Sequence, residues 1–135
     1  MEKQSFEKDI KVFGIKVKTF PNGIGDAFNE LIKETGDGAG KRNYYGISEY
    51  KNGKMIYYAV AEEKQEDEAQ KYNYETCIIE KGEYLAEPLK NWRDKTDCIK
   101  DVFTKMMRSD AVNKEKPCIE WYKNDEEMLC MMKVK

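Results

Sequence analysis

Two segments of this chain follow the same pattern, and that pattern constrains the fold more than any other feature. In each segment an amphipathic helix is followed by two strand-like runs joined by a turn. The turns are Tyr50-Lys51-Asn52-Gly53 and Tyr122-Lys123-Asn124-Asp125, which start 72 positions apart. A pattern that recurs at such a spacing indicates a duplicated unit.

Apolar residues at positions i, i+3, i+4, i+7 and i+8 predict one helix before each hairpin. These residues are Ile24, Ala27, Phe28, Leu31 and Ile32 in the first segment and Ile99, Val102, Phe103, Met106 and Met107 in the second. We expect Pro21-Asn22 and Gly36 to bound the first helix, and Thr96 or Asp97 to precede the second. The helix-to-hairpin loop, residues 35–41, is three residues longer in the first segment because the helices are offset by 75 positions.

One strand is predicted before each helix, over residues 12–20 and over residues 74–86, the second with a bend or bulge at Gly82. The expected fold is therefore α+β, a tandem β-α-β-β repeat with one antiparallel sheet and two main helices. Residues 1–135 are predicted to form a single domain, with repeat one at about 12–61 and repeat two at about 72–135. The glutamate-rich residues 62–71 between them are expected to be a solvated connector.

The composition narrows the classes of function. The chain has 24 lysines and arginines and 26 aspartates and glutamates, with the two signs interspersed. No large basic patch is therefore expected, which argues against direct nucleic-acid binding. No apolar run approaches the roughly 20 residues of a membrane span, and the polar N-terminus lacks the apolar region of a signal peptide. We expect a cytoplasmic protein that does not associate with membranes.

The four cysteines and the absence of histidine limit the chemistry. Cys77, Cys98, Cys118 and Cys130 form no C-x-x-C pair and are predicted to be small buried side chains in a reducing compartment. Without histidine, neither a Ser-His or Cys-His relay nor a histidine metal ligand is available, and no cofactor or metal is predicted. Any acid–base chemistry would use Glu, Asp, Tyr, Lys or water.

Glu120 is the candidate functional residue because it lies among apolar and aromatic residues. The run Pro117-Cys118-Ile119-Glu120-Trp121-Tyr122 is typical of a strand. A carboxylate in such surroundings is costly unless water, a hydrogen-bond donor or a cation compensates it. Glu120 is therefore a candidate for holding a positively charged ligand or for proton transfer.

Three local matches give the chain a resemblance to the GyrI-like family, the effector-binding domains of AraC- and MerR-type transcription regulators, which also occur as free-standing proteins. Residues 117–122 resemble the family's late E-x-Y strand, residues 82–86 the strand after a G-x-Y turn, and residues 45–48 the counterpart strand in the first repeat. The resemblance extends from about Phe13 to Lys135. It implies the family's tandem β-α-β-β fold.

The resemblance also implies a ligand cleft between the repeats. In the family, the late-strand glutamate, here Glu120, lies in an aromatic-lined pocket that accepts bulky hydrophobic, often cationic, compounds. Tyr122 shares a strand face with Glu120. The further candidates for the lining are Tyr44, Tyr58, Tyr84, Trp92 and Trp121. Trp121 alternates to the opposite face, which favours a core position, and only one of the adjacent Tyr57 and Tyr58 can face a pocket.

The chain lacks the helix-turn-helix of the full-length regulators, so the resemblance implies a stand-alone protein that senses or sequesters hydrophobic, aromatic or cationic small molecules. Two alternatives stay open. Some free-standing family members hydrolyse cyclopropane-containing natural products, and here Glu120 and Tyr122 would position and activate the water. The family name also implies a gyrase-inhibitor-like module that binds a protein, although the sequence identifies no such partner.

Overall fold

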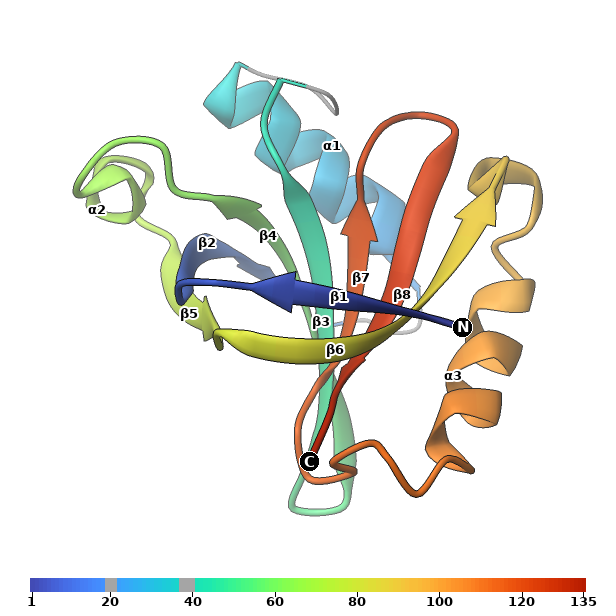
Figure 1. The fold of residues 1–135 in the computed structure, drawn as a ribbon. Coiled ribbons are helices and arrows are strands. Elements are labelled where there is room, and N and C mark those ends of the chain that lie inside the picture. Colours follow the sequence, from blue (N-terminus) through green and yellow to red (C-terminus); the bar gives the residue numbers. More distant parts are fainter. Residues whose placement is uncertain (19–21, 37–40) are drawn as a thin grey trace.

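A curved antiparallel sheet forms the body of the molecule (Figure 1). The computed structural model describes residues 1–18, 22–36 and 41–135. Within these residues the strands are β1 (Glu2–Phe6), β2 (Ile10–Lys16), β3 (Tyr44–Lys51), β4 (Lys54–Glu62), β5 (Glu75–Ile79), β6 (Gly82–Lys90), β7 (Cys118–Tyr122) and β8 (Glu127–Lys133). The helices are α1 (Ile24–Thr35), α2 (Glu68–Tyr72), the 3-10 turn η1 (Trp92–Asp94) and α3 (Cys98–Met107).

The strand order is β1-β6-β8-β7-β3-β4-β2-β5, and both halves of the sheet share one arrangement. The order β6-β8-β7 in one half corresponds to β2-β4-β3 in the other, and the halves meet where β7 pairs with β3. At this junction Ile47 lies opposite Ile119, the residue 72 positions later. The α+β class, the single antiparallel sheet and the two main helices are thus confirmed.

The two main helices cover the same face of the sheet but different strands (Figure 1). Helix α1 packs mainly on β4 and β2, whereas α3 packs mainly on β8. The central strands β3 and β7 therefore lie between the helices on this face. On the opposite face the sheet curls, and residues from its two ends cover the centre. This core includes Ile47, Ile119, Ile79, Tyr84, Val12 and Met131.

Local sequence accounts for most element boundaries. Gly36 ends α1 in a left-handed conformation (φ 75°), and its amide donates to the carbonyl of Ile32. Asn52 and Gly53, with φ of 53° and 76°, form the two-residue turn between β3 and β4 that such residues favour. Asp97 precedes α3 as predicted, whereas Pro21 and residues 37–40 of the longer loop lie outside the described residues.

The strand predicted over residues 74–86 is wrong as a single element. The structure divides it into β5, which pairs with β2 of the first half, and β6, which pairs with β1 and β8. Gly82 begins β6 at φ 127°, a conformation that glycine adopts easily. The polar N-terminal residues form β1, which the sequence pattern did not indicate.

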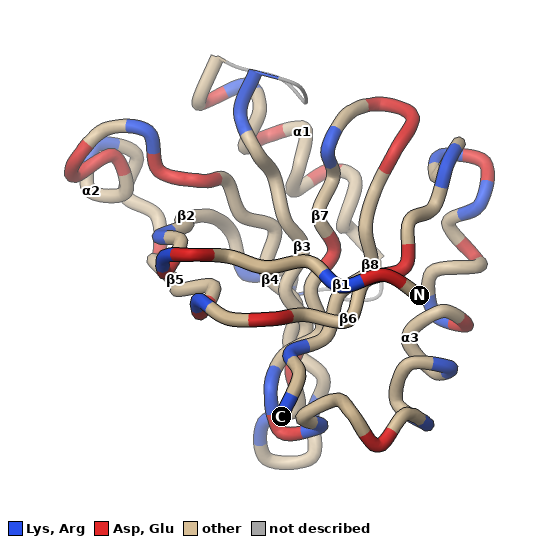
Figure 2. The backbone as a smooth tube through the Cα atoms, in the orientation of Figure 1, with Lys and Arg blue, Asp and Glu red and all other residues tan. Residues whose placement is uncertain are grey.

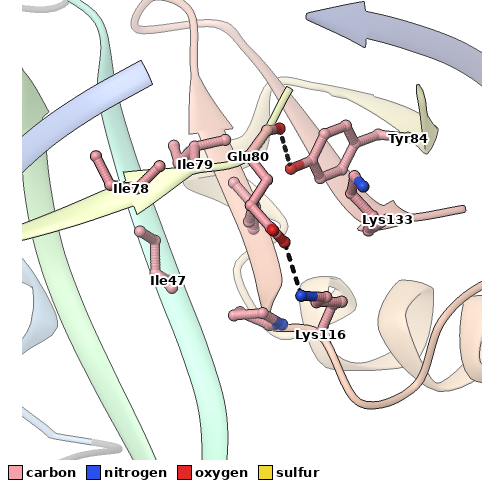
Figure 3. Close-up of a pocket in the computed structure, with 9 residues that line it drawn as sticks. Ile47, Ile78, Ile79, Glu80, Tyr84, Lys116 and Lys133 are labelled. Atoms are coloured by element: carbon pink, nitrogen blue, oxygen red, sulfur yellow. Dashed lines mark hydrogen bonds and ion pairs between the residues drawn. The ribbon is translucent and has the colours of Figure 1, made fainter. Parts of the chain in front are cut away.

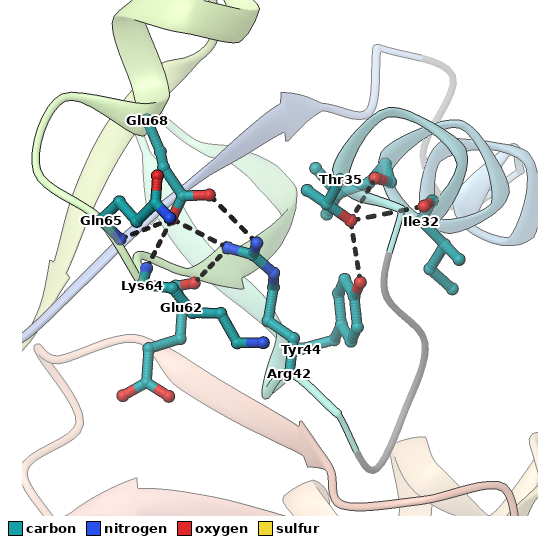
Figure 4. A network of polar contacts seen from close by, with 9 residues as sticks. Ile32, Thr35, Arg42, Tyr44, Glu62, Lys64, Gln65 and Glu68 are labelled. Carbon is teal, nitrogen blue, oxygen red and sulfur yellow. Dashed lines mark hydrogen bonds and ion pairs between the residues drawn. The ribbon is translucent and has the colours of Figure 1, made fainter.

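The connector between the halves is exposed at residues 64–67 and 70–71, but it is attached to the rest of the molecule by a buried glutamate (Figure 4). Glu68 is buried, and both of its oxygens accept hydrogen bonds of 3.0 Å from the Arg42 guanidinium. Burial opposes ionisation of Glu68, but the bonds from Arg42 and from the amides of Gln65 and Lys64 outweigh it and lower its pKa to about 2. None of the helices in the described ranges is long and apolar enough to cross a membrane.

Candidate functional site

Glu120 lies on central strand β7, in the part of the sheet flanked by α1 and α3. In the register of the sheet it is opposite Gly46 of β3 on one side and Cys130 of β8 on the other. Strand alternation places Tyr122 on the same face. Glu120 and Tyr122 are half-buried although their strand is central, because neither helix packs mainly on β7.

Two tyrosine hydroxyls hold the carboxylate of Glu120. The hydroxyl of Tyr57 donates to Oε1 at 2.5 Å, and that of Tyr122 donates to the same oxygen at 2.6 Å. These lengths are typical of hydrogen bonds from a hydroxyl to an ionised carboxylate. Tyr57 comes from the first half of the chain and Tyr122 from the second, so the site requires both halves.

Gly46 allows Tyr57 to reach the carboxylate. Tyr57 lies on β4, and β3 separates β4 from β7. The end of the Tyr57 side chain lies over Gly46: a Cβ at residue 46 would be 1.9 Å from Tyr57 Oη and 2.5 Å from Glu120 Oε1. Any side chain at this position would occupy the space of the hydrogen bond.

The second carboxylate oxygen, Oε2, accepts no hydrogen bond within the described residues. It is not among the fully buried unpartnered polar atoms, so part of its surface remains accessible. No lysine or arginine of the described part of the chain forms an ion pair with Glu120. Burial raises the pKa of Glu120, and the hydrogen bonds from Tyr122 and Tyr57 only oppose that rise. In the described part of the chain, the site therefore holds an acidic group without a counter-charge.

Burial and the charge of Glu120 keep the neighbouring groups protonated. Desolvation, followed by the negative charge of Glu120, raises the pKa of Tyr57 and of Tyr122 well above the ordinary value, so both remain donors. Burial likewise raises the pKa of Cys118 to about 11 and that of Cys130 to about 12. Neither thiol is therefore suited to act as a nucleophile near neutral pH.

Aromatic rings from both halves surround Tyr122. Its ring meets Phe28 of α1 edge-to-face at 5.2 Å between centroids, and Trp92 of η1 at 4.9 Å. All three side chains are half-buried. The accessible part of this face thus combines one uncompensated carboxylate with three partly exposed rings.

The structure brings four of the seven predicted residues to this face. Glu120, Tyr122 and Trp92 lie together, as described above. Tyr44 lies opposite Tyr122 in the register but is buried, and its hydroxyl is 3.0 Å from Thr35 Oγ1 (Figure 4). Tyr44 therefore belongs to the interface with α1 rather than to the accessible surface.

The other three predicted residues lie on the opposite face of the sheet. Tyr58, Tyr84 and Trp121 all pack with the core around Ile47 and Ile119. The hydroxyl of Tyr84 donates to the carbonyl of Glu80 at 2.7 Å, and Trp121 donates from Nε1 to Asn43 Oδ1 at 3.2 Å. The sheet separates all three from the carboxylate of Glu120.

Three site residues were not assigned from the sequence. The sequence did not decide whether Tyr57 or Tyr58 faces the site, because strand alternation alone does not fix which face each occupies. Phe28 was assigned only to the apolar stripe of its helix. Gly46 carried no signal of its own, since its role depends on the register of β3 against β4 and β7.

Two cavities of the described residues lie elsewhere. The first, of about 30 Å³, is on the opposite face between Ile47, Ile119 and Tyr84, with Glu80 bound to Lys116 at its mouth (Figure 3). That volume suits about one water molecule. The second, of about 210 Å³, is polar; it is lined by Lys41, Arg42, Asn43, Glu62 and Lys64. In the parts of the chain that the structure describes, no three His, Cys, Asp or Glu side chains gather as metal ligands would.

Comparisons with known proteins establish the fold. No protein-family model and no curated protein matches the chain. Solved structures do, and one is an integron cassette protein from the mobile metagenome of Vibrio cholerae, with a TM-score of 0.71 and 13% identity over 99% of this chain and 95% of that one. Another is SAV2435 bound to tetraphenylphosphonium, with a TM-score of 0.72 and 14% identity over 99% and 93% of the two chains.

A third structure is a candidate bacterial transcription regulation protein from Staphylococcus aureus MU50. Its TM-score is 0.63, with 14% identity over 98% of this chain and 97% of that one. Identities this low show a shared fold and no more. The likeness covers nearly the whole chain in all three cases.

Proposed function

We propose that this chain is a small-molecule-binding protein of the GyrI-like type, which holds hydrophobic cations against Glu120. The observation that carries the proposal is the half-buried carboxylate of Glu120, which has two hydroxyl donors but no cationic partner among the described residues. Such a group disfavours its own ionised form, and a bound cation would supply the missing charge. Oε2, which accepts no hydrogen bond within the described residues, is the atom that would face it.

The surroundings favour a large, weakly hydrated cation over a metal ion. The partly exposed rings of Phe28, Tyr122 and Trp92 can each add roughly 0.5–2 kcal/mol through contact with a cation. Burial of apolar ligand surface adds about 25 cal/mol per Å². These terms together are compatible with micromolar affinity, about −8 kcal/mol. They require little directional hydrogen bonding, so the specificity is expected to be broad.

The structural comparison supports a choice of probe. SAV2435, which shares this fold, was solved bound to tetraphenylphosphonium, a cation shielded by four phenyl rings. A ligand of this kind has no hydrogen-bond donor and interacts through charge and ring contacts. It therefore matches what the Glu120 site offers.

Calorimetric titration with tetraphenylphosphonium tests the proposal. Wild type is expected to bind saturably, and Glu120→Gln to bind at least tenfold more weakly, about 1.4 kcal/mol. The matched control is Glu49→Gln, since Glu49 lies on the other face of β3, paired with Lys51 at 3.3 Å. Wild-type affinity in the control is expected. Equal binding by Glu120→Gln, or none by wild type, would refute the site.

On this proposal the chain serves as a sensor or a sequestering protein. One observation favours a second candidate, a hydrolase of cyclopropane-type electrophiles. A carboxylate whose pKa is raised, and whose Oε2 accepts no hydrogen bond within the described residues, can accept a proton from water while Tyr57 and Tyr122 hold its other oxygen. If wild type hydrolyses a cyclopropane-containing compound and Glu120→Gln does not, this candidate is supported. If the compound binds but is not hydrolysed, hydrolase activity on that compound is excluded.

A further inference from the structure

The turn that carries Trp92 is fastened to the β7–β8 turn above the Glu120 site. The amide of Asn91 donates to the carbonyl of Glu126 at 2.5 Å, and Nε1 of Trp92 donates to the carbonyl of Asn124 at 3.0 Å. Arg93 is paired with Asp125 at 2.9 Å. Together these three contacts, which we call the latch, attach η1 to the turn between β7 and β8, and Glu120 lies on β7.

The indole of Trp92 lies between this surface latch and the site. The guanidinium of Arg93 lies over the indole, 4.8 Å from the ring centroid, and the ring of Tyr122 meets the indole edge-to-face at 4.9 Å. The hydroxyl of Tyr122 in turn donates to Glu120. A ligand that uses this side of Tyr122 must therefore displace the indole.

The ion pair is the part of this attachment that costs least to break. Arg93 and Asp125 have 63% and 75% of their side-chain surface exposed, and exposed ion pairs contribute little to stability. No residue of η1 is buried. The indole is half-buried and packs at the edge of the core cluster between α3 and β8, whereas Tyr57 and Gly46 on the far side of the carboxylate are fully buried in the sheet.

We propose that Trp92 is the movable wall that determines the size of the cation that the Glu120 site accepts, and that Arg93 and Asp125 position it. This inference rests on the proposed function. Small cations such as tetramethylammonium bind with the wall in place. Tetraphenylphosphonium binds only when the indole leaves Tyr122, so it must also break the Arg93–Asp125 pair.

A first experiment tests the latch without any ligand. Trp92 and Trp121 are the two tryptophans of the chain, so a Trp121→Phe background leaves Trp92 as the sole fluorophore. In that background, Asp125→Asn is expected to increase acrylamide quenching of Trp92. The control Asp101→Asn changes an exposed acidic residue on α3 and should leave the quenching unaltered.

A second experiment measures specificity by calorimetry with tetraphenylphosphonium and tetramethylammonium. Asp125→Asn and Arg93→Gln should each raise the affinity ratio of the large cation to the small one by about two- to fivefold, the range for an exposed pair. Because the two residues act as a pair, the double variant should gain no more than either single variant. The ratio cancels any general effect of the altered charge on cation binding.

The outcomes separate this inference from the proposed function. An unchanged ratio in both variants overturns the movable wall, and so does quenching that Asp125→Asn leaves unaltered. If tetraphenylphosphonium binds wild type and Glu120→Gln equally, the proposed function fails, whatever the quenching shows. If binding depends on Glu120 but the ratio does not depend on Asp125 or Arg93, only the inference about Trp92 fails.

Discussion

Replacing Gly46 with alanine should disrupt the Glu120 site with a single methyl group. The new Cβ would be 1.9 Å from Tyr57 Oη and 2.5 Å from Glu120 Oε1, far inside van der Waals contact. Tyr57 is only 1% exposed, so its ring has little room to move away. Overpacking of this kind costs about 1–3 kcal/mol, and the lost hydrogen bond to a charged group adds about 1.5–3 kcal/mol. We therefore expect the free energy of unfolding to fall by about 2.5–6 kcal/mol.

Urea unfolding of Gly46→Ala and two other glycine variants checks this magnitude. At Gly25, in helix α1, an added Cβ would meet nothing within 4 Å, so Gly25→Ala should stabilise by about 0.5–1 kcal/mol. At Gly14, the Cβ would be 2.0 Å from the backbone oxygen of Ala59. Gly14→Ala should destabilise the sheet but leave the bonds to Glu120, so its folded molecules should still bind tetraphenylphosphonium.

A double-mutant cycle with Tyr57→Phe measures how much of the cost of Gly46→Ala depends on the Tyr57 hydroxyl. Tyr57→Phe removes the hydroxyl, so Gly46→Ala should cost less in that background than in wild type. The clash remains in part, because the same Cβ would be 2.7 Å from the ring carbon that carries the hydroxyl. The reasoning is refuted if Gly46→Ala is as stable as wild type, or if its cost is the same with and without the hydroxyl.

Three further predictions concern charge and backbone. Glu120→Gln should raise the free energy of unfolding at about pH 7 by about 1 kcal/mol, measured by urea unfolding. Wild type should become more stable as the pH falls from the raised folded pKa of Glu120 towards 4.5, because the folded state binds the proton more tightly than the unfolded state. Glu120→Gln should abolish this pH dependence. Arg42→Met leaves the buried Glu68 without its counter-charge and should lower the free energy of unfolding by about 3 kcal/mol in the same assay. In wild type the ionised pair stabilises the fold above about pH 4.5, and that stabilisation should be lost as the pH falls towards 2. Gly53 has φ 76°, a conformation that costs alanine about 1–2 kcal/mol, so Gly53→Ala should lower the free energy of unfolding by that amount in the same assay.

Local periodicity explains why much of the fold could be predicted. The apolar stripes of α1 and α3 and the turns at residues 50–53 and 122–125 are encoded within short windows, and all appear in the structure. The division at Gly82 is different, because both β5 and β6 have strand-like sequences. What separates them is pairing with β2 and with β8, contacts between residues far apart in the chain. No local pattern contains that information.

The candidate site, like the fold, could be predicted only where it depends on local sequence. Alternation along one strand placed Glu120 and Tyr122 on one face and Trp121 on the other, as the structure has them. The contribution of Tyr57 depends on how β4 is aligned with β3 and β7, and that of Trp92 on how the β6–α3 connection folds back. Such relations between elements arise from packing and register, which a single sequence does not display.

Similar halves would on their own produce a similar environment on both sides of the junction, and the site comes from where they differ. Ile47 and Ile119 lie opposite each other at the junction, so Ser48 occupies in the first half the position that Glu120 occupies in the second. Gly46 corresponds in the same way to Cys118. The serine leaves one carboxylate rather than two like charges on a shared face, where each would disfavour ionisation of the other. The glycine opens the path for a tyrosine from β4. The arrangement that the two halves share therefore sets the location of the site. The differences at residues 46 and 48 leave a single negative charge there, with space beside it for the side chain of Tyr57.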